Sequence, residues 1–458
     1  MRLASILAIC CLTACVPSPG ADVSMNKTKA STSTSLTLPP EMNRFGLTSA
    51  GRPQRSNPEI ARDFLELSFR MESGRPLPVL TRFEGPITVR TAGAVPPSAA
   101  TDLSRLLARF RNEAGLNIRE VAQGPASINI EFVPRKTIQA TYANVACFVV
   151  PRVGSWDEFR ASRNNGTLDW ASLSQRDRVS VFIPADSSAQ EVRDCLHEET
   201  AQAMGPLNDL FRLTDSVFND DNFHTSLTGF DMTILRAYYA PELRSGMTQE
   251  QVAAKLPGIL ARINPAGNRA GSSEATPTPR QWINAIEVAL GNGGSADRRE
   301  AAARQALSIA KAQGWTGGRL AFSYFAIGRL TLARDPNTAI SAFTEAGRIY
   351  RSLPGGAIHA AHVDMQLAAY ALSQGQADKA LELANRTMPV VAAAENAALM
   401  ATLMLVKAEA LSMKGRSKEA AAVRIDSRGW ARYGFGSDAQ VKARAAEISA
   451  LARRGNRS

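Results

Sequence analysis

The chain has few of the residues and short patterns on which most enzyme classes depend. Among its 458 residues there are only four histidines and five cysteines. It contains no Gly-rich phosphate loop, no G-x-S-x-G sequence and no Cys-x-x-Cys pair. These absences leave no support for a nucleotide phosphate loop, a nucleophile-elbow hydrolase or a dithiol redox site.

Long apolar runs and concentrated charge are also missing. The only strong apolar run, Leu3–Leu12, is too short to span a bilayer stably, which excludes a polytopic membrane protein. Lys and Arg total 53 against 42 Asp and Glu, and the net charge of +11 is too dispersed to predict nucleic-acid binding. A composition of 45% apolar and 21% charged residues is typical of a soluble globular protein, and the length predicts two or three domains.

The first residues form a secretory signal, because Arg2 precedes the short apolar run and small residues follow it. The run ends Leu12-Thr-Ala-Cys15, which resembles a bacterial lipobox. That resemblance implies removal of residues 1–14 and lipid attachment at Cys15. Because Val16 follows, it also implies release to the outer membrane rather than retention by an Asp. We therefore expect a periplasmic, membrane-anchored protein; an ordinary signal peptide with an incidental cysteine is the alternative.

Two cysteines are left to pair in the mature chain. Cys10 and Cys11 leave with the signal and Cys15 carries lipid, so Cys147 and Cys195 are an even number in an oxidising compartment. We predict a disulfide between them. Two buried free thiols are the alternative.

Composition divides the rest of the chain into a tether, two domains and a linker. Residues 15–56 are rich in Ser, Thr, Pro, Gly and Asn without a hydrophobic period, which predicts a flexible tether after the lipidated cysteine. Order is expected to begin with Asn57 as a helix N-cap and Pro58 at the first helical position. A second such stretch, 263–280, predicts a linker. The domains are therefore 57–262 and 281–455.

The first domain mixes strands and helices. An amphipathic pattern at 101–114 and a capped run from Ser187 or Ser188 to Met204 predict two long helices. Strands are expected at 87–91, 116–121, 128–133, 146–150 and 179–183. The order is strand, helix, four strands and a long helix, which predicts an α+β domain with a mixed sheet.

The second domain is almost all helix, and its sequence repeats. Three stretches, near Asp335, Gly375 and Gly415, share a turn followed by an alanine-rich helix. Each helix has a small residue at the same position, which lets paired helices cross closely: Ala339, Ala380 and Ala420, 41 and 40 residues apart. The pattern resembles tetratricopeptide-type repeats with a period longer than the usual length of about 34 residues. A non-repetitive helical bundle is the alternative.

The second long helix of the first domain carries the candidate site. Beginning at Glu198, the sequence reads E-E-x-x-Q-x-x-G-x-x-N, in which the glycine is Gly205 and the last residue is Asn208. This is the spacing of the long metzincin motif, H-E-x-x-H-x-x-G-x-x-H. Glu199 stands where the catalytic base stands, whereas Glu198, Gln202 and Asn208 replace the three histidine ligands.

These residues resemble a metzincin-like zinc protease fold with a degraded metal site. The predicted order of strands and helices is the metzincin order, and Thr228–Tyr239 resembles the closing helix of such proteases. The chain also resembles an uncharacterised family of proteobacterial lipoproteins with a domain of unknown function, through Asp63–Gly74 and the run from Phe218 to Met247. That family implies no known activity.

The donor set of this motif disfavours zinc. Carboxamide oxygens are weak zinc ligands, and His197 lies about 100° round the helix from the face of Glu198 and Gln202. His224 could return to the site, and Asp209 could support it. We therefore expect no metal and no cofactor.

Three interpretations of Glu198, Glu199 and Gln202 stay open. In the first, they form a buried polar network. In the second, they line a pseudoenzyme cleft that binds peptide or glycan along an edge strand. In the third, they form a working hydrolase site, because adjacent buried carboxylates raise one another's pKa, which suits acid–base catalysis. We favour a non-catalytic binding and assembly protein of the cell envelope, with an envelope protein or peptide in the repeat groove and no nucleic-acid partner. The alternative is an atypical metal-dependent or Glu-driven hydrolase of peptide or peptidoglycan.

Overall fold

The computed structural model describes residues 51–143, 145–271, 276–291 and 293–455. The predicted signal, the predicted lipidation site Cys15 and the predicted tether up to residue 50 lie outside the described residues.

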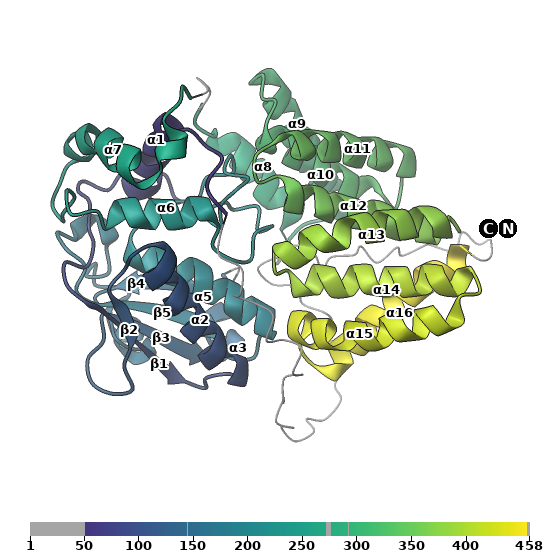
Figure 1. Ribbon diagram of the computed structural model, residues 1–458, viewed down its shortest axis with the longest axis horizontal. Helices are drawn as coiled ribbons and strands as arrows, with labels where there is room; N and C mark the ends of the chain where they lie inside the picture. The colour runs from purple at the N-terminus through teal and green to yellow at the C-terminus, as the bar shows by residue number, and fades with distance from the viewer. Residues whose placement is uncertain (1–50, 144, 272–275, 292, 456–458) are drawn as a thin grey trace. The chain divides into compact units, whose positions relative to one another are not determined.

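The described residues form two units (Figure 1). The first unit, 51–220 with 224–271, mixes helices with a five-stranded sheet, and the second, 276–455 with 221–223, is helical along its continuous part. An α+β domain followed by an all-helical region is therefore confirmed as the fold class.

The sheet of the α+β unit has the strand order β2-β1-β3-β5-β4. Four strands run parallel: β1 (Ile87–Gly93), β2 (Ile118–Glu120), β3 (Ile128–Val133) and β5 (Val179–Pro184). The edge strand β4 (Phe148–Pro151) pairs with β5 antiparallel, with Phe148 opposite Phe182. Strand β5 is buried at every position, as its continuous apolar sequence predicts for a strand covered on both faces.

Helices pack against this sheet and around its ends. They are α1 (Asn57–Ser68), α2 (Pro97–Glu113), α3 (Arg135–Gln139), α4 (Trp156–Ser162), α5 (Ala189–Met204), α6 (Gly229–Tyr238) and α7 (Gln249–Ile263), with short 3-10 turns at Trp170–Ser172 and Pro265–Gly267. The main core joins the sheet to α2 and α5, which lie side by side; Leu103, Leu106 and Phe110 of α2 are fully buried there. A separate aromatic cluster around β4 and α4 contains Phe148, Trp156, Phe159 and Phe182, with ring centroids 5.1–6.2 Å apart.

The start of α1 differs by one residue from the prediction. Ser56, not Asn57, is the N-cap: its hydroxyl accepts the N–H of Glu59, and the Glu59 carboxylate accepts the N–H of Ser56 at 2.9 Å. This reciprocal capping box satisfies two donors that the first turn would otherwise leave open.

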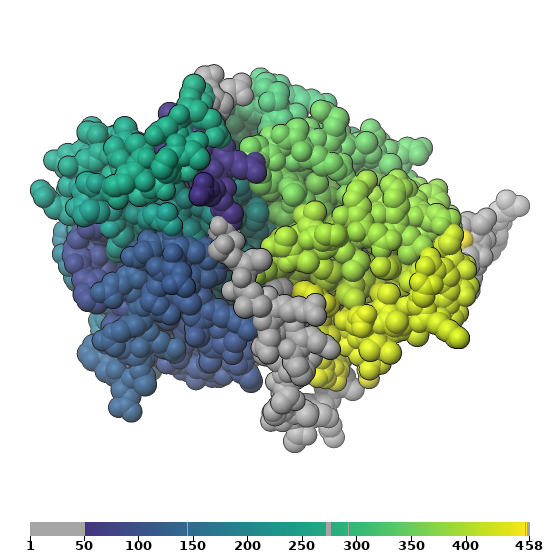
Figure 2. All heavy atoms as spheres, viewed as in Figure 1, coloured from purple at the N-terminus to yellow at the C-terminus, as the bar shows by residue number. Residues whose placement is uncertain are grey.

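The helical unit is built from antiparallel pairs. Its helices are α8 (Arg280–Leu290), α9 (Ala296–Ala312), α10 (Gly318–Thr331), α11 (Pro336–Ser352), α12 (Ala357–Ser373), α13 (Ala377–Ala393), α14 (Ala397–Met413), α15 (Ser417–Phe435) and α16 (Asp438–Gly455). Each helix packs on the next from α8 to α15, and α16 returns onto α12 and α14. In the space-filling view the atoms of this unit, coloured green to yellow, cover the helices drawn as ribbons in Figure 1 (Figure 2).

The small residues of the repeat lie where the helices cross. Ala339, Ala380 and Ala420 are fully buried. A Cβ atom on Gly328 of α10 would lie 2.6 Å from the Phe343 ring of α11, so this crossing requires glycine. The helical unit also includes Asp221–Phe223, and the Phe223 ring lies among Phe325, His359 and His362 at centroid distances of 4.6–5.2 Å.

Candidate functional site

Helix α5 holds most of the predicted site residues within two turns. It begins where the Ser188 hydroxyl accepts the N–H of Glu191 at 3.2 Å. Val192 and Leu196 are fully buried in the main core and fix the rotation of the helix. Glu198 and Gln202, four residues apart, therefore share a face.

Gly205 ends α5 at a close contact. A Cβ atom at this position would lie 2.8 Å from the Tyr238 ring of α6, so any larger residue would push the two elements apart. The glycine of the predicted motif is thus required by packing.

Arg176 caps the end of α5 from the loop before β5. Its guanidinium donates to the carbonyl oxygens of Gln202 at 2.6 Å, Ala203 at 2.8 Å and Gly205 at 2.5 Å, and it lies over the Trp170 ring. Tyr239 Oη donates to the Met204 carbonyl at 2.9 Å. These donors satisfy carbonyls that a helix end leaves open.

Gln202 connects α5 to two acids from other segments. Its Nε2 donates to Asp209 Oδ2 at 3.5 Å, and both Gln202 and Asp209 hydrogen-bond with Glu72, which follows α1. Glu199 and Gln202 are buried, with 6% and 5% of their surface exposed. Glu198 and Asp209 are half-buried, and Glu72 is exposed as a whole residue. The site therefore extends from the interior to the surface.

The Asn208 side chain hydrogen-bonds with the backbone of α1. Its Nδ2 donates to the Glu66 carbonyl of α1 at 3.0 Å, so this side chain anchors the chain after Gly205 to α1. Asp209, the next residue, takes the place beside Gln202 that the motif spacing predicts for Asn208.

The two histidines considered for the site bind backbone groups. His197 is 3% exposed, and its Nδ1 accepts the N–H of Leu227 at 3.1 Å. Burial, with Arg193 and Arg109 nearby, holds the pKa of His197 well below its usual range, so the ring is neutral. His224 Nε2 lies 3.0 Å from the Thr214 carbonyl oxygen.

The acids of the site hold their protons unusually tightly. Burial raises the pKa of Glu198 to about 8, with further contributions from the charges of Glu72, Asp220 and Asp231. Burial and the charges of Glu198 and Glu72 raise the pKa of Glu199 well above its usual range. The pKa of Asp209 is also raised well above its usual range by burial and then by Glu72, Glu198 and Asp220.

The donor set does not fit zinc. Within the described part of the chain, no group of three or more His, Cys, Asp or Glu side chains could hold a metal ion. Of the three positions that replace histidine in the motif, Asn208 donates its amide to Glu66, and Gln202 donates to Asp209.

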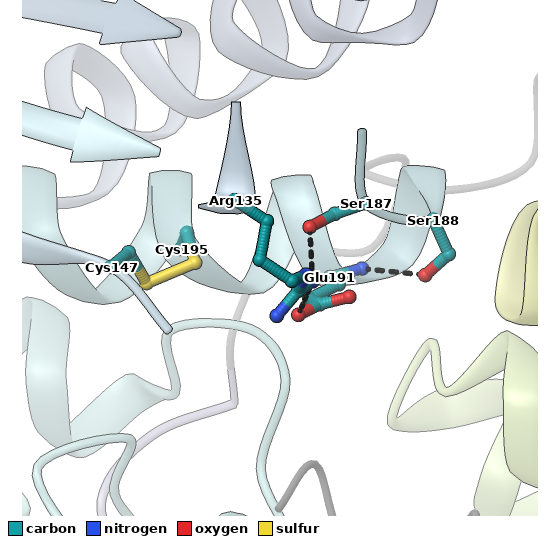
Figure 3. Close-up of a disulfide and its surroundings, with 6 residues drawn as sticks. All are labelled: Arg135, Cys147, Ser187, Ser188, Glu191 and Cys195. Carbon is teal, nitrogen blue, oxygen red and sulfur yellow. Dashed lines mark hydrogen bonds and ion pairs between the residues drawn. A yellow bond between two sulfur atoms is a disulfide. The ribbon is translucent and has the colours of Figure 1, made fainter. Parts of the chain in front are cut away.

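A disulfide joins Cys147, directly before the edge strand β4, to Cys195 of α5, so the predicted pairing is confirmed (Figure 3). One turn earlier in α5, Glu191 forms an ion pair with Arg135, whose guanidinium also donates to the Ser187 hydroxyl at 2.5 Å. The bridge ties β4 to α5 one turn before Glu198.

Glu72 is the site residue that sequence reasoning missed. It lies in Asp63–Gly74, the segment that resembles the domain of unknown function, but no spacing relates it to α5. Only the fold brings the chain after α1 against α5.

Residues 57–258 match a protein family described as "Protein of unknown function (DUF2927)". No curated protein and no solved structure matches the chain. The predicted domain of unknown function is confirmed for this segment. The metzincin-like and lipoprotein parts of the prediction stay predictions.

We expect the disulfide to increase the free energy of unfolding. Without reductant, proteolysis should yield a linked peptide pair containing Cys147 and Cys195. Replacing both cysteines by alanine should lower the free energy of unfolding by about 2–4 kcal/mol, because the bridge closes a loop in the unfolded chain. Denaturant titration measures this, and reductant should destabilise the wild type but not the double variant. Equal sensitivity of both proteins to reductant would refute the bridge.

The raised pKa of Glu198 predicts how stability depends on pH. A carboxyl whose folded pKa is about 8 binds its proton more tightly when folded, so stability falls as pH rises from its unfolded pKa of about 4.3 towards 8. We expect Glu198→Gln to raise the melting temperature at pH 8 by roughly 3–6 °C and to change it little at pH 5.

Glu120→Gln, at the exposed end of β2, is the matched control and should have little effect at either pH. If Glu198→Gln lowers the melting temperature at pH 8, the carboxylate is stabilising and the assignment is wrong.

Proposed function

We propose that this protein is a lipid-anchored binding and assembly protein of the cell envelope. Its first domain is a metzincin-like pseudo-peptidase, and its helical region is a tetratricopeptide-like scaffold. Binding, rather than hydrolysis, is the function of the α5 face.

One observation carries this proposal: the residues at the would-be ligand positions serve other purposes. Asn208 donates to the Glu66 carbonyl and Gln202 donates to Asp209. His197, the nearest imidazole in sequence, accepts a backbone N–H. A catalytic zinc needs three protein ligands and an open position, and these side chains are already engaged.

The order of elements supports the metzincin-like assignment. Strand β1 is followed by α2, then β2, β3, β4, β5 and the long α5, with the short α3 and α4 added between strands. The edge strand β4 lies at the border of the described sheet and is linked by Cys147 to α5. An extended peptide added along β4 would therefore lie beside the α5 face.

The helical region supports a scaffold role. Its antiparallel pairs recur with buried alanines 41 and 40 residues apart, which is the construction of a stacked repeat. Stacked helix pairs offer an extended surface on which a partner protein or peptide of the envelope binds.

The anchor is proposed from the sequence around Cys15. None of the helices in the described part of the chain is long and apolar enough to cross a membrane. Several acyl chains on one cysteine would hold the protein durably at a membrane, and Val16 favours the outer membrane.

A second candidate function is a Glu-driven hydrolase of peptide or peptidoglycan. The observation in its favour is Glu198, half-buried and with a pKa of about 8, since a general acid works best with a pKa near the working pH.

The zinc content of the protein and the effect of Glu199→Gln on hydrolysis distinguish the binding function from the hydrolase function. Protein purified without chelator should contain less than about 0.1 zinc per chain, because the donor set is poor. Glu199→Gln should change any peptide or peptidoglycan hydrolysis less than about twofold, where loss of a general base costs about 100-fold or more. Stoichiometric zinc, with hydrolysis abolished by Glu199→Gln at unchanged stability, would refute the binding function.

The anchor is tested by Cys15→Ser. The substitution should abolish labelling by a radioactive fatty acid and move the protein from the membrane fraction to the soluble periplasmic fraction. A variant that still sediments with membranes would show that Cys15 is not the anchor.

A further inference from the structure

Four acids interact with one another beside α5. Glu198 and Glu199 come from α5 itself, Glu72 from the chain after α1, and Asp209 from the chain after Gly205. We refer to these four residues as the α5 acidic cluster. Gln202 hydrogen-bonds with two of its members, Glu72 and Asp209, and holds them together.

Two carboxyl oxygens of the cluster are buried without a hydrogen-bond partner among the described residues. They are Glu199 Oε2 and Asp209 Oδ1. Glu199 is 94% buried, and its carboxyl interacts with the charges of Glu198 and Glu72, so it faces the cluster. An unmet buried carboxyl oxygen costs free energy that a donor on a ligand would recover.

Among the described residues, the charges that act most strongly on Glu198, Glu199 and Asp209 belong to other acids. Glu198 interacts with Glu72, Asp220 and Asp231, and Asp209 interacts with Glu72, Glu198 and Asp220. This is unusual in a chain with a net charge of +11.

The same domain neutralises another buried acid. Asp63, fully buried in α1, lies 2.7 Å from Arg212 and 3.4 Å from Arg55. The domain therefore pairs a structural carboxylate with arginine, whereas within the described residues the main charges acting on the α5 acidic cluster come from other acids.

The cluster extends to the surface of the domain. Glu72 is exposed, and Glu198 and Asp209 are half-buried. Within the described residues, these acids are not arranged as a group that could hold a metal ion. A primary ammonium group supplies both a positive charge and three N–H donors, which matches several carboxyl oxygens at once.

We propose that the α5 acidic cluster binds a primary ammonium group of a peptide, from its N-terminus or from a basic side chain. This inference rests on the proposed binding function of the α5 face and names the chemistry of its ligand.

Calorimetric titration of the full chain at pH 8 tests the proposal with two probes. Nα-acetyl-lysine amide presents a side-chain ammonium and Ala-Ala amide an N-terminal one. At least one should bind in the millimolar range, whereas the lysine probe acetylated on Nε should not. Binding of the lysine probe should release protons, because the cation favours the ionised carboxyls, and should tighten as pH rises to 8. The N-terminal ammonium of Ala-Ala amide loses its proton at about pH 8, so that probe is compared at pH 7. Glu72, Glu198, Glu199 and Asp209 are the groups that would face the ligand, and the charges of Asp220 and Asp231 act on them from nearby.

Glu72→Gln is the main variant, because an exposed residue is replaced and the fold is preserved. It should weaken binding about tenfold, as loss of a charged hydrogen-bond partner does. Glu199→Gln should do the same, and Glu120→Gln should bind like the wild type.

Three outcomes would overturn the inference: neither amine binds, the amines bind Glu72→Gln and Glu199→Gln as tightly as the wild type, or calcium or magnesium chloride binds the cluster more tightly than the amines. Each leaves the proposed binding function to be judged by zinc content and hydrolysis, so the two proposals fail separately.

Discussion

Helix α5 ends inside the α+β domain, where its open carbonyl groups need donors that bulk water does not supply. Arg176 bonds three of these carbonyls and Tyr239 a fourth. A guanidinium suits this place because its planar fork reaches several acceptors at once, and the negative end of the helix dipole favours its charge. The positions of Cys195, Glu198 and Gln202 relative to the sheet all depend on this fixed end.

The domain buries carboxyl groups in two different ways. Asp63 is paired with arginines, so its charge contributes to holding α1 against the chain around Arg212. Glu198 and Glu199 of α5 have acids around them and keep their protons instead. Unpaired buried acids lower stability, and such an arrangement is typical of places where a protein gives up stability for binding or chemistry.

Local signals in the sequence predicted the elements, and long-range contacts decided the site. The apolar run of β5 and the Ser188 cap and Gly205 end of α5 are local, so their prediction agrees with the structure. The pairing of Cys147 with Cys195 followed from counting the cysteines of a chain predicted to be secreted. The contact of Glu72 with Asp209 joins distant segments and leaves no periodic trace, and the turn of Asn208 towards Glu66 depends on where α1 packs. Helix α7 was also not predicted, although Thr248 and Gln251 form a capping box at its start.

The anchor at the end of α5 consists of backbone carbonyls, an arginine and a tyrosine hydroxyl, and none of these changes its protonation near neutrality. The carboxyls one or two turns earlier do change theirs. The geometry of the helix end therefore does not depend on pH, whereas the charge of the carboxyls that the helix carries does. When the surroundings become more or less acidic, the attraction exerted by this face changes while the places of its oxygen atoms stay the same.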